Sequence, residues 1–469
     1  MNYKILVNKT HPYKKSCSNN VILQRITNEV GDEYLLEKRT LKAYLELKKD
    51  LEKDNIKISI NSGYRSIEEQ IETKKKYLEI FGSAYTKKYV AGPGFSEHHT
   101  GLCFDIDIIV NGKVVDEYQD LTPYMDIFAI IIDKLKDYGL ILRYPKGKED
   151  ITGYSYEPWH YRYVGKSTAN IITDNNLTLE EYDELYNKSG VLLVNKPKDL
   201  TSRDVVNKLE KVFDTKKIGH NGTLDPLAEG LLVITINRST KINELLTCTD
   251  KEYIASVKVG VETDTLDLEG NIVKTSEKEI SKDMLDNLFK EFKKEYLQTV
   301  PKYSAIKVNG KKLYEYARSN KDVELPKRKV TIKELELLDY KEDSFKFRCV
   351  VSKGTYIRSL IKDMGDFLDI PCTMSSLKRT RQGKFSLDNA IELDDVTINS
   401  NLINISEALD IETIEINDND YKKVVNGASI NNDYNIKDKV LFIKDNRVIA
   451  IYQNVNNKLK CFKMLNETN

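Results

Sequence analysis

The chain has 469 residues, 40% of them hydrophobic, and its 73 Lys and Arg residues balance its 73 Asp and Glu residues. This length exceeds one ordinary hydrophobic core and predicts more than one domain, whereas the overall charge neither favours nor excludes a polyanionic partner. No apolar run approaches the roughly 20 residues that span a bilayer, and residues 1–9 lack the apolar core of a signal peptide, so we expect a cytoplasmic protein without a membrane span.

The cysteines are scattered and show no paired metal-binding spacing, which fits a reducing compartment. We interpret them as structural thiols. They are Cys17, Cys103, Cys248, Cys349, Cys372 and Cys461.

The first half contains two histidines and an aspartate that could bind a metal. His98 precedes Asp105 by seven residues, and alternating residues from 102 to 108 predict a strand with an apolar face in the core and with Asp105 and Asp107 on the other face. His160 follows in the segment Glu-Pro-Trp-His-Tyr. Two imidazoles and a carboxylate can hold zinc and leave a fourth position for water, although histidines satisfied within a core are commoner.

Four ordered segments of this half resemble the VanY-type D-alanyl-D-alanine carboxypeptidases. They are Leu-Val-Asn-Lys at 6–9, Ser-Gly-Tyr-Arg-Ser at 62–66 with Gln70, the segment 96–105, and Glu-Pro-Trp-His-Tyr at 157–161. The resemblance implies zinc as the cofactor, with His98, Asp105 and His160 as its ligands. It also implies that Glu157 takes a proton from the attacking water and that Arg65 stabilises the oxyanion that develops on the carbonyl.

Cys103 departs from this family, which more often has alanine two residues before the ligand aspartate. The change leaves the ligands intact but could alter the packing behind them. The resemblance implies D-Ala-D-Ala-terminated peptides or peptidoglycan precursors as partners. Wall carboxypeptidases commonly act outside the cell. Because we expect this chain in the cytoplasm, we expect its first domain to trim cytosolic precursors or D-Ala dipeptides.

The second half contains a carboxylate in a glycine-rich loop. Residues 219–230 read Gly-His-Asn-Gly-Thr-Leu-Asp-Pro-Leu-Ala-Glu-Gly, between two apolar runs, 191–194 and 231–236, that predict buried strands. Asp225 is therefore a candidate nucleophile. Taken alone, the segment fits equally well an Asp-Pro pair that only opens a turn.

This loop and four other ordered segments resemble the TruB family of tRNA pseudouridine synthases. The others are Gly-Val-Leu-Leu-Val-Asn-Lys-Pro at 190–197, Lys-Glu-Tyr at 251–253, Val-Pro-Lys-Tyr-Ser-Ala-Ile-Lys at 300–307 and Lys-Gly-Thr-Tyr-Ile-Arg-Ser-Leu at 353–360. The resemblance covers residues 189–469. It implies a central mixed sheet with a cleft, conversion of uridine to pseudouridine without a cofactor, and tRNA as the substrate, usually at uridine 55 of the T arm.

The resemblance also implies roles for individual residues. Asp225 is the nucleophile or charge-stabilising carboxylate, Arg358 pairs with it, and Tyr253 stacks on the flipped uracil and could assist removal of the C5 proton. We expect residues 354–358 to run as a strand, which would put Tyr356 and Arg358 on one face, with Tyr356 beneath the base.

Two further residues match the family less distinctively. His220 corresponds to a loop histidine that supports the RNA fold, but a histidine satisfied by backbone groups is nearly as good a reading. Leu377 corresponds to an apolar wall of the pocket, although most leucines are simply core residues.

Basic clusters beside these motifs are candidates for phosphate contacts, in which case RNA binding should weaken steeply with salt. They are Lys307, Lys311 and Lys312, then residues 327–329, and then Lys378, Arg379, Arg381 and Lys384.

We expect a monomer that binds the T-arm stem-loop of tRNA.

The expected organisation is two α+β domains. A zinc peptidase-like domain occupies 1–188, a synthase domain with a mixed sheet occupies 189–415, and a small β-rich, RNA-binding-like extension occupies 416–469. Our preferred hypothesis is a bifunctional enzyme. The alternatives are a synthase whose first domain only binds, and a peptidase whose second half is an inactive RNA-binding module.

Overall fold

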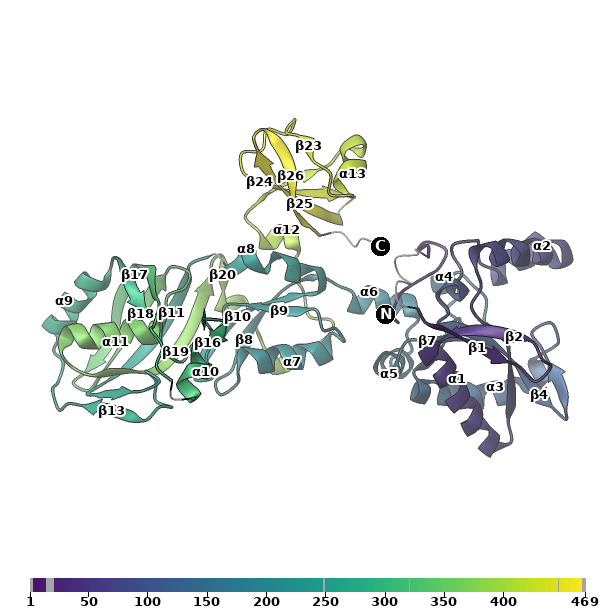
Figure 1. Cartoon of the computed structure of the whole chain (residues 1–469), viewed down its shortest axis with the longest axis horizontal. Helices are drawn as coiled ribbons and strands as arrows, with labels where there is room; N and C mark the ends of the chain where they lie inside the picture. The colour runs from purple at the N-terminus through teal and green to yellow at the C-terminus, as the bar shows by residue number, and fades with distance from the viewer. Residues whose placement is uncertain (1–2, 14–20, 248, 320, 446, 466–469) are drawn as a thin grey trace. The chain divides into compact units, whose positions relative to one another are not determined.

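The computed structural model describes residues 3–13, 21–247, 249–319, 321–445 and 447–465 (Figure 1). The chain divides into two compact units, residues 1–187 and residues 188–467. Both units combine helices with strands in mainly antiparallel sheets, which confirms the predicted α+β class. Cys17 and Cys248 lie outside the described residues.

In the first unit the chain forms the following elements. The helices are α1 (Lys38–Leu51), α2 (Ile67–Tyr89), α3 (Met125–Lys134), α4 (Glu149–Thr152), α5 (Lys166–Asp174) and α6 (Leu179–Tyr186). The strands are β1 (Leu23–Thr27), β2 (Glu33–Glu37), β3 (Lys57–Ser62), β4 (Cys103–Val110), β5 (Lys113–Val115), β6 (Leu140–Leu142) and β7 (His160–Tyr163).

Strand β4 lies inside an antiparallel sheet with the order β3-β4-β7-β6, to which β5 adds beside β4. Phe104, Ile106 and Ile108 are at most 1% exposed and belong to one core. This confirms the strand predicted from their alternation. Because side chains alternate across a strand, Asp105 lies on the opposite face, directly across from His160 on β7.

Helix α1 covers this core because its apolar residues recur at helical spacing. Leu41, Tyr44, Leu47 and Leu51 are buried. The helix begins at a carboxylate cap, since Glu37 accepts hydrogen bonds from backbone N–H groups of the first turn at 2.8 and 3.2 Å. Acidic caps satisfy orphan N–H groups and suit the positive end of the helix dipole.

The second unit contains the remaining elements. The helices are α7 (Ser202–Val212), α8 (Asn243–Thr247), α9 (Lys282–Phe292), α10 (Leu313–Arg318), α11 (Ile357–Leu368), α12 (Ile405–Ala408) and α13 (Asp418–Val424). The strands of its large sheet are β8 (Gly190–Lys196), β9 (Ile218–Asn221), β10 (Ala228–Ile236), β11 (Lys251–Val259), β14 (Glu295–Thr299), β17 (Lys327–Lys341), β18 (Ser344–Val351), β19 (Cys372–Gln382), β20 (Phe385–Ser386) and β21 (Ile391–Glu392). The smaller sheets use β12 (Val261–Thr263), β13 (Ile272–Thr275), β15 (Lys307–Val308), β16 (Lys311–Lys312), β22 (Glu412–Glu415), β23 (Ile430–Asn431), β24 (Lys439–Lys444), β25 (Arg447–Val455) and β26 (Lys458–Met464).

The large sheet is mixed. Its order is β14-β17-β18-β11-β19-β10-β8-β21, with β9 beside β10 and β20 beside β19. The predicted strands in the two apolar runs are confirmed as β8 and β10, which pair antiparallel, whereas β10 and β19 pair in parallel. This parallel contact brings residues 228–230 beside residues 377–379. Strands β22 to β26 form a separate five-stranded sheet near the C-terminus.

The strand expected over residues 354–358 is wrong. Strand β18 ends at Val351, Gly354 takes a left-handed φ of +86°, and helix α11 begins at Ile357. A helix forms here because Ile357, Leu360 and Met364 recur at helical spacing and are buried. Burial of this helical face stabilises the segment more than the short alternation at 354–358 would stabilise a strand. Arg358 therefore sits in the first turn of a helix.

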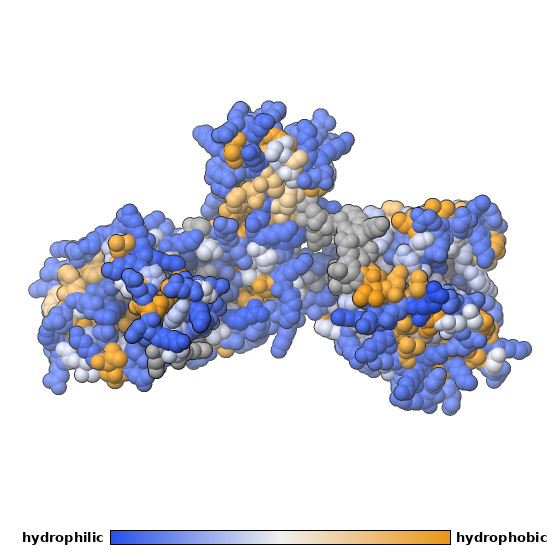
Figure 2. Space-filling view, in the orientation of Figure 1, coloured by the Kyte–Doolittle hydropathy of each residue, from blue (hydrophilic) through white to orange (hydrophobic). Residues whose placement is uncertain are grey.

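The molecular surface is mostly hydrophilic on the face seen in Figure 2, where apolar side chains form separate patches. One group of exposed apolar residues lies on α2 and includes Ile71, Leu78 and Ile80. Within the described ranges, none of the helices combines the length and the apolar character needed to cross a bilayer.

Candidate active sites

The loop that carries Asp225 connects β9 to β10 and is held by its neighbours. The Ser202 hydroxyl accepts a hydrogen bond from Leu224 N at 2.9 Å and donates one to Leu224 O at 3.1 Å. On the other side of the aspartate, Asp199 N donates to Pro226 O at 2.8 Å. Because backbone groups on both sides are fixed, the Asp225 carboxylate is presented from a rigid turn.

Arg379 anchors the same loop from beneath. It is 0% exposed, and its guanidinium donates from Nε to Leu231 O at 2.7 Å and from Nη2 to Gly222 O at 2.9 Å. Gly230 allows this close approach, since a Cβ there would lie 2.4 Å from Arg379 O and the residue has a φ of +101°. The expectation that Arg379 contacts RNA phosphates is therefore wrong, because the side chain is buried and its guanidinium donates hydrogen bonds to backbone carbonyls.

Arg358 forms an ion pair with Asp225. Its Nη2 lies 2.9 Å from Asp225 Oδ2, with the arginine side chain 7% exposed and the aspartate side chain 38% exposed. Its other hydrogen bonds go to Thr265 O at 2.9 Å and Tyr303 O at 3.1 Å, and Nη1 lies 3.6 Å from Asp267 Oδ2. The guanidinium is thus fixed, while the carboxylate keeps an open side toward solvent.

Two tyrosines lie close enough to Asp225 to feel its charge. Burial raises the pKa of Tyr253 against the effect of Arg379, and the Asp225 carboxylate adds to the rise. Burial likewise raises the pKa of Tyr356, and Asp225 contributes here too. Both phenols are therefore neutral at physiological pH. Gln298 fixes the Tyr356 backbone through bonds of 2.8 and 3.1 Å.

Leu377 and His220 lie on strands of the same sheet. Leu377 is 8% exposed in the main core and is the register partner of Ala228 and Ala255, which places it at the base of the Asp225 loop. His220 is half-buried on β9, opposite Ile234. Burial lowers the pKa of His220, so the imidazole is neutral.

In the first unit, the structure brings His98, Asp105 and His160 together. His98 Nε2 lies 3.3 Å from Asp105 Oδ2, and His160 Nδ1 lies 2.8 Å from Asp105 Oδ1. His98 Nδ1 is within hydrogen-bonding distance of Gly63 O at 2.7 Å, which leaves Nε2 as the nitrogen that faces the aspartate. Such a backbone contact fixes the tautomer of a metal-ligating histidine.

These residues fit a divalent metal ion of the zinc class. Asp105 is 8% exposed, yet its Oδ1 accepts no hydrogen bond from any described residue, although His160 Nδ1 is near. The Asp105 carboxylate and one nitrogen of each imidazole lie 2.8 to 3.3 Å apart in a buried site, which is an arrangement that suits ligand atoms around a shared cation. Zinc takes nitrogen and oxygen ligands of this kind in four-coordinate sites.

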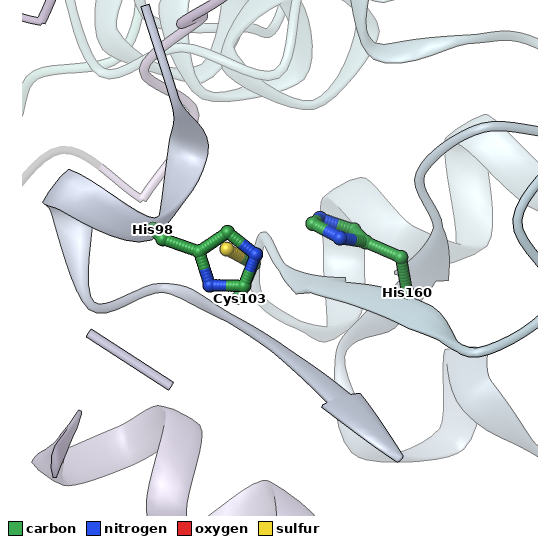
Figure 3. A group of neighbouring side chains, drawn as sticks. All are labelled: His98, Cys103 and His160. Atoms are coloured by element: carbon green, nitrogen blue, oxygen red, sulfur yellow. The ribbon is translucent and has the colours of Figure 1, made fainter. Parts of the chain in front are cut away.

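Cys103 belongs to the same cluster, which the sequence reasoning missed. Its sulfur and the ligand nitrogens of His98 and His160 all lie within 4.8 Å of one another, and the three residues are buried (Figure 3). Burial opposes ionisation of the thiol, but the two imidazoles lower the pKa of Cys103 to about 7. The sequence does carry a signal for this. Cys103 lies two residues before Asp105, and residues two apart on a strand point to the same face.

A cavity of about 370 Å³ opens beside this cluster and is lined by both predicted catalytic residues. Arg65 is oriented by hydrogen bonds from Nη2 to Ser62 Oγ at 2.9 Å and from Nη1 to Gln70 Oε1 at 3.0 Å. Glu157 is 5% exposed, and its Oε2 lies 3.7 Å from His160 Nδ1. Burial raises the pKa of Glu157 to about 8, so the metal-free site favours its protonated form at neutral pH.

Behind the metal-site cluster, Glu97 is buried between two arginines. Its Oε1 accepts from Arg143 Nε at 2.8 Å and from Arg162 Nη1 at 2.6 Å, and all three side chains are 0% exposed. Its Oε2 lies 3.8 Å from His160 Nε2. The pKa of Glu97 falls below its usual range because the two guanidinium groups overcome the opposing effect of burial.

We expect Glu97→Gln to destabilise the first unit by about 3–5 kcal/mol, because it removes the buried carboxylate that pairs with Arg162 and leaves Arg143 only its ion pair with Glu180. Trp159 is the single tryptophan of the chain, so its fluorescence during denaturant unfolding of the full-length protein reports on this unit alone. Glu46→Gln, at an exposed position of α1, is the control. An unchanged unfolding midpoint for Glu97→Gln would contradict this reading.

Each of the two units is similar to a known protein family. Residues 210–357 match the TruB family pseudouridylate synthase N-terminal domain, and residues 33–166 match the D-alanyl-D-alanine carboxypeptidase family VanY. The tRNA pseudouridine synthase B of Geobacillus thermodenitrificans is 44% identical over 255 residues, 51% of this chain and 84% of that protein. Its counterpart from Oceanobacillus iheyensis is 43% identical over 281 residues, 56% of this chain and 92% of that protein.

A solved structure described as VanYB in complex with D-alanine-D-alanine is 30% identical, covering 39% of this chain and 97% of that chain, with a TM-score of 0.33. The relatives of the second unit support pseudouridine synthase activity on tRNA. The chain therefore belongs to the TruB family of tRNA pseudouridine synthases, to which residues 33–166 add a domain of the VanY family.

Proposed function

We propose that the second unit isomerises a uridine in the T arm of tRNA and that Asp225 is the reacting carboxylate. The observation that carries this proposal is the 2.9 Å ion pair between Asp225 and Arg358, set in a loop whose backbone is fixed on both sides of the aspartate. The ion pair fixes the orientation of the carboxylate, while more than a third of the Asp225 side chain stays accessible to a flipped nucleotide.

The reaction needs no cofactor, because it only moves one bond. The bond from C1′ of the ribose to N1 breaks, a bond from C1′ to C5 forms, the C5 proton leaves, and N1 gains a proton. Asp225 acts as nucleophile or stabilises the charge that develops, and Arg358 orients it. Tyr253, a neutral phenol on strand β11 of the same sheet, stacks on the uracil. Tyr356 and Leu377 supply walls for the base, and His220 supports the bound RNA.

We further propose that exposed basic residues of this unit contact the RNA backbone. Lys307, Lys311, Lys327 and Arg328 are exposed, and they follow the segment that carries Tyr303. A C-terminal extension at 416–469, which holds four strands of the five-stranded sheet, would extend this surface as a separate RNA-binding part, after a synthase domain at 189–415 and a peptidase domain at 1–188. The protein would act as a monomer in the cytoplasm, where tRNA is modified.

We propose that the first unit is a zinc-dependent peptidase for D-Ala-D-Ala-terminated peptides or peptidoglycan precursors. Its support is the convergence of His98, Asp105 and His160 beside a cavity that Glu157 and Arg65 also line. When bound there, zinc would acidify a water molecule, polarise the peptide carbonyl and favour the ionised form of Glu157. Glu157 then takes the proton, and Arg65 stabilises the negative oxygen that develops.

Metal removal separates the two proposed activities. We expect a chelator to abolish cleavage of a D-Ala-D-Ala-terminated peptide and to leave pseudouridine formation on unmodified tRNA unchanged, because the Asp225 site uses no metal. Both products are measured on the same preparation of full-length protein, and zinc is added back as the control. Pseudouridine formation that falls with the chelator, or cleavage that persists, would contradict this assignment.

A further inference from the structure

The thiol of Cys103 occupies a position that the peptidase mechanism does not use. Strand β4 turns Cys103 and Asp105 to the same face, and β7 presents His160 opposite Asp105. Cys103 is 0% exposed, so its sulfur faces the cluster and not solvent. The sulfur and the two imidazole nitrogens lie within 4.8 Å of one another.

We propose that Cys103 is a fourth protein ligand of the metal ion held by His98, Asp105 and His160, and that its sulfur competes with water for the metal. This inference rests on the proposed metal site of the first unit. It changes the character of that site, because four protein ligands complete a tetrahedral shell, whereas catalytic zinc sites keep one position open.

The distances allow this ligation with small movements. With bonds of about 2.3 Å to sulfur and about 2.0–2.1 Å to nitrogen, two ligands of one tetrahedral zinc lie about 3.6 Å apart. Since the present separations are at most 4.8 Å, the ligand atoms need to approach by no more than about 1.2 Å. The Asp105 carboxylate already lies 2.8 and 3.3 Å from the two imidazoles, so these three groups are within reach of one ion.

Charge also favours the thiolate. The site is buried, and a divalent cation beside one aspartate would carry a net positive charge away from water. A thiolate together with the Asp105 carboxylate neutralises two positive charges, which lowers the cost of burying the ion. Sulfur is also the softer ligand and selects zinc, cobalt or cadmium over hard cations such as magnesium.

Cobalt binding tests the ligation directly. Metal-free, full-length wild type, Cys103→Ala and Cys103→Ser are titrated with Co²⁺ under reducing conditions. We expect one equivalent to give a sulfur-to-cobalt charge-transfer band in the wild type and no such band in either variant, with affinity at least about tenfold weaker in the variants. Cys461→Ala, a half-buried cysteine of the second unit, is the matched control and should keep the band.

Turnover tests the competition. With zinc bound, we expect Cys103→Ala to raise kcat/KM on a D-Ala-D-Ala-terminated peptide by about tenfold or more, since the coordination position taken by sulfur is freed for water. Cys103→Ser should lie between the two. If Cys103→Ala shows no gain in turnover, the proposal that the Cys103 sulfur competes with water for the metal is overturned, whether or not the wild type cleaves the peptide.

The outcomes distinguish this inference from the proposed function on which it rests. Cobalt that binds the wild type with one equivalent but without the sulfur band would overturn ligation by Cys103 and leave the three-ligand site standing. Failure of both the wild type and Cys103→Ala to bind cobalt would overturn the metal site itself. Trp159 fluorescence verifies that each variant is folded, and Cys103→Ser replaces Cys103→Ala if the smaller side chain unfolds the unit.

Discussion

Asp225→Ala is expected to abolish pseudouridine formation while tRNA binding survives. The change removes the carboxylate that we propose as the reacting group, so turnover should fall by about 10⁴-fold or more. We expect binding to rely mainly on phosphate contacts away from the carboxylate and therefore to change little. Single-turnover release of tritium from C5-labelled tRNA measures the first quantity, and filter binding measures the second.

Controls separate chemistry from folding in this experiment. Asp225→Asn keeps the size of the side chain and should be almost as inactive, because the amide lacks the charge. Asp394→Ala removes a carboxylate whose side chain is 90% exposed and should behave as the wild type. Residual turnover in Asp225→Ala of more than a few per cent would remove Asp225 from the role of reacting group.

Glu157→Ala is expected to stop peptide cleavage while the metal stays bound. A general base that takes a proton from water contributes about 10²–10⁴-fold, so kcat should fall by that factor. The metal content should stay at the wild-type level, because the proposed ligand atoms come from His98, Asp105, His160 and Cys103 and not from Glu157. Peptide hydrolysis is followed by release of D-alanine, and bound zinc by elemental analysis of the dialysed protein.

Glu157→Ala is also combined with Cys103→Ala. We expect turnover to be higher in the Cys103→Ala protein, so the loss of peptide cleavage caused by Glu157→Ala is easier to measure there. Glu46→Ala, an exposed carboxylate of the same unit, is the control. If zinc is lost from Glu157→Ala, then Glu157 is a ligand or a support of the ligands. If cleavage continues, another group takes the proton.

Local patterns in the sequence were enough to predict the strands that carry the chemistry. The alternation at 102–108 predicted β4 and the side of the strand on which Asp105 lies, and the apolar runs around Asp225 predicted β8 and β10. These predictions succeeded because a strand's side-chain period and the burial of apolar residues are properties of a short segment. The two family resemblances rest on the same kind of local information, as ordered motifs.

The structure overturned predictions wherever a residue's partner lies far away in the chain. Residues 354–358 were expected to form a strand, but the buried face of α11 needs a helix there. Arg379 was expected at the RNA surface, but the parallel pairing of β19 with β10 places it under the Asp225 loop, where it bonds to a carbonyl 148 residues away. No local pattern reports which strand will lie beside another.

The sequence by itself therefore determined the two families, the α+β class and the three candidate metal ligands, because each is written in short motifs or in local periodicity. Only the tertiary structure decided that Arg358 meets Asp225 from the start of a helix, that Glu97 is locked between two buried arginines, and that the sulfur of Cys103 faces two imidazoles. Each of these contacts joins different elements, and strand register and packing set which side chains of those elements meet.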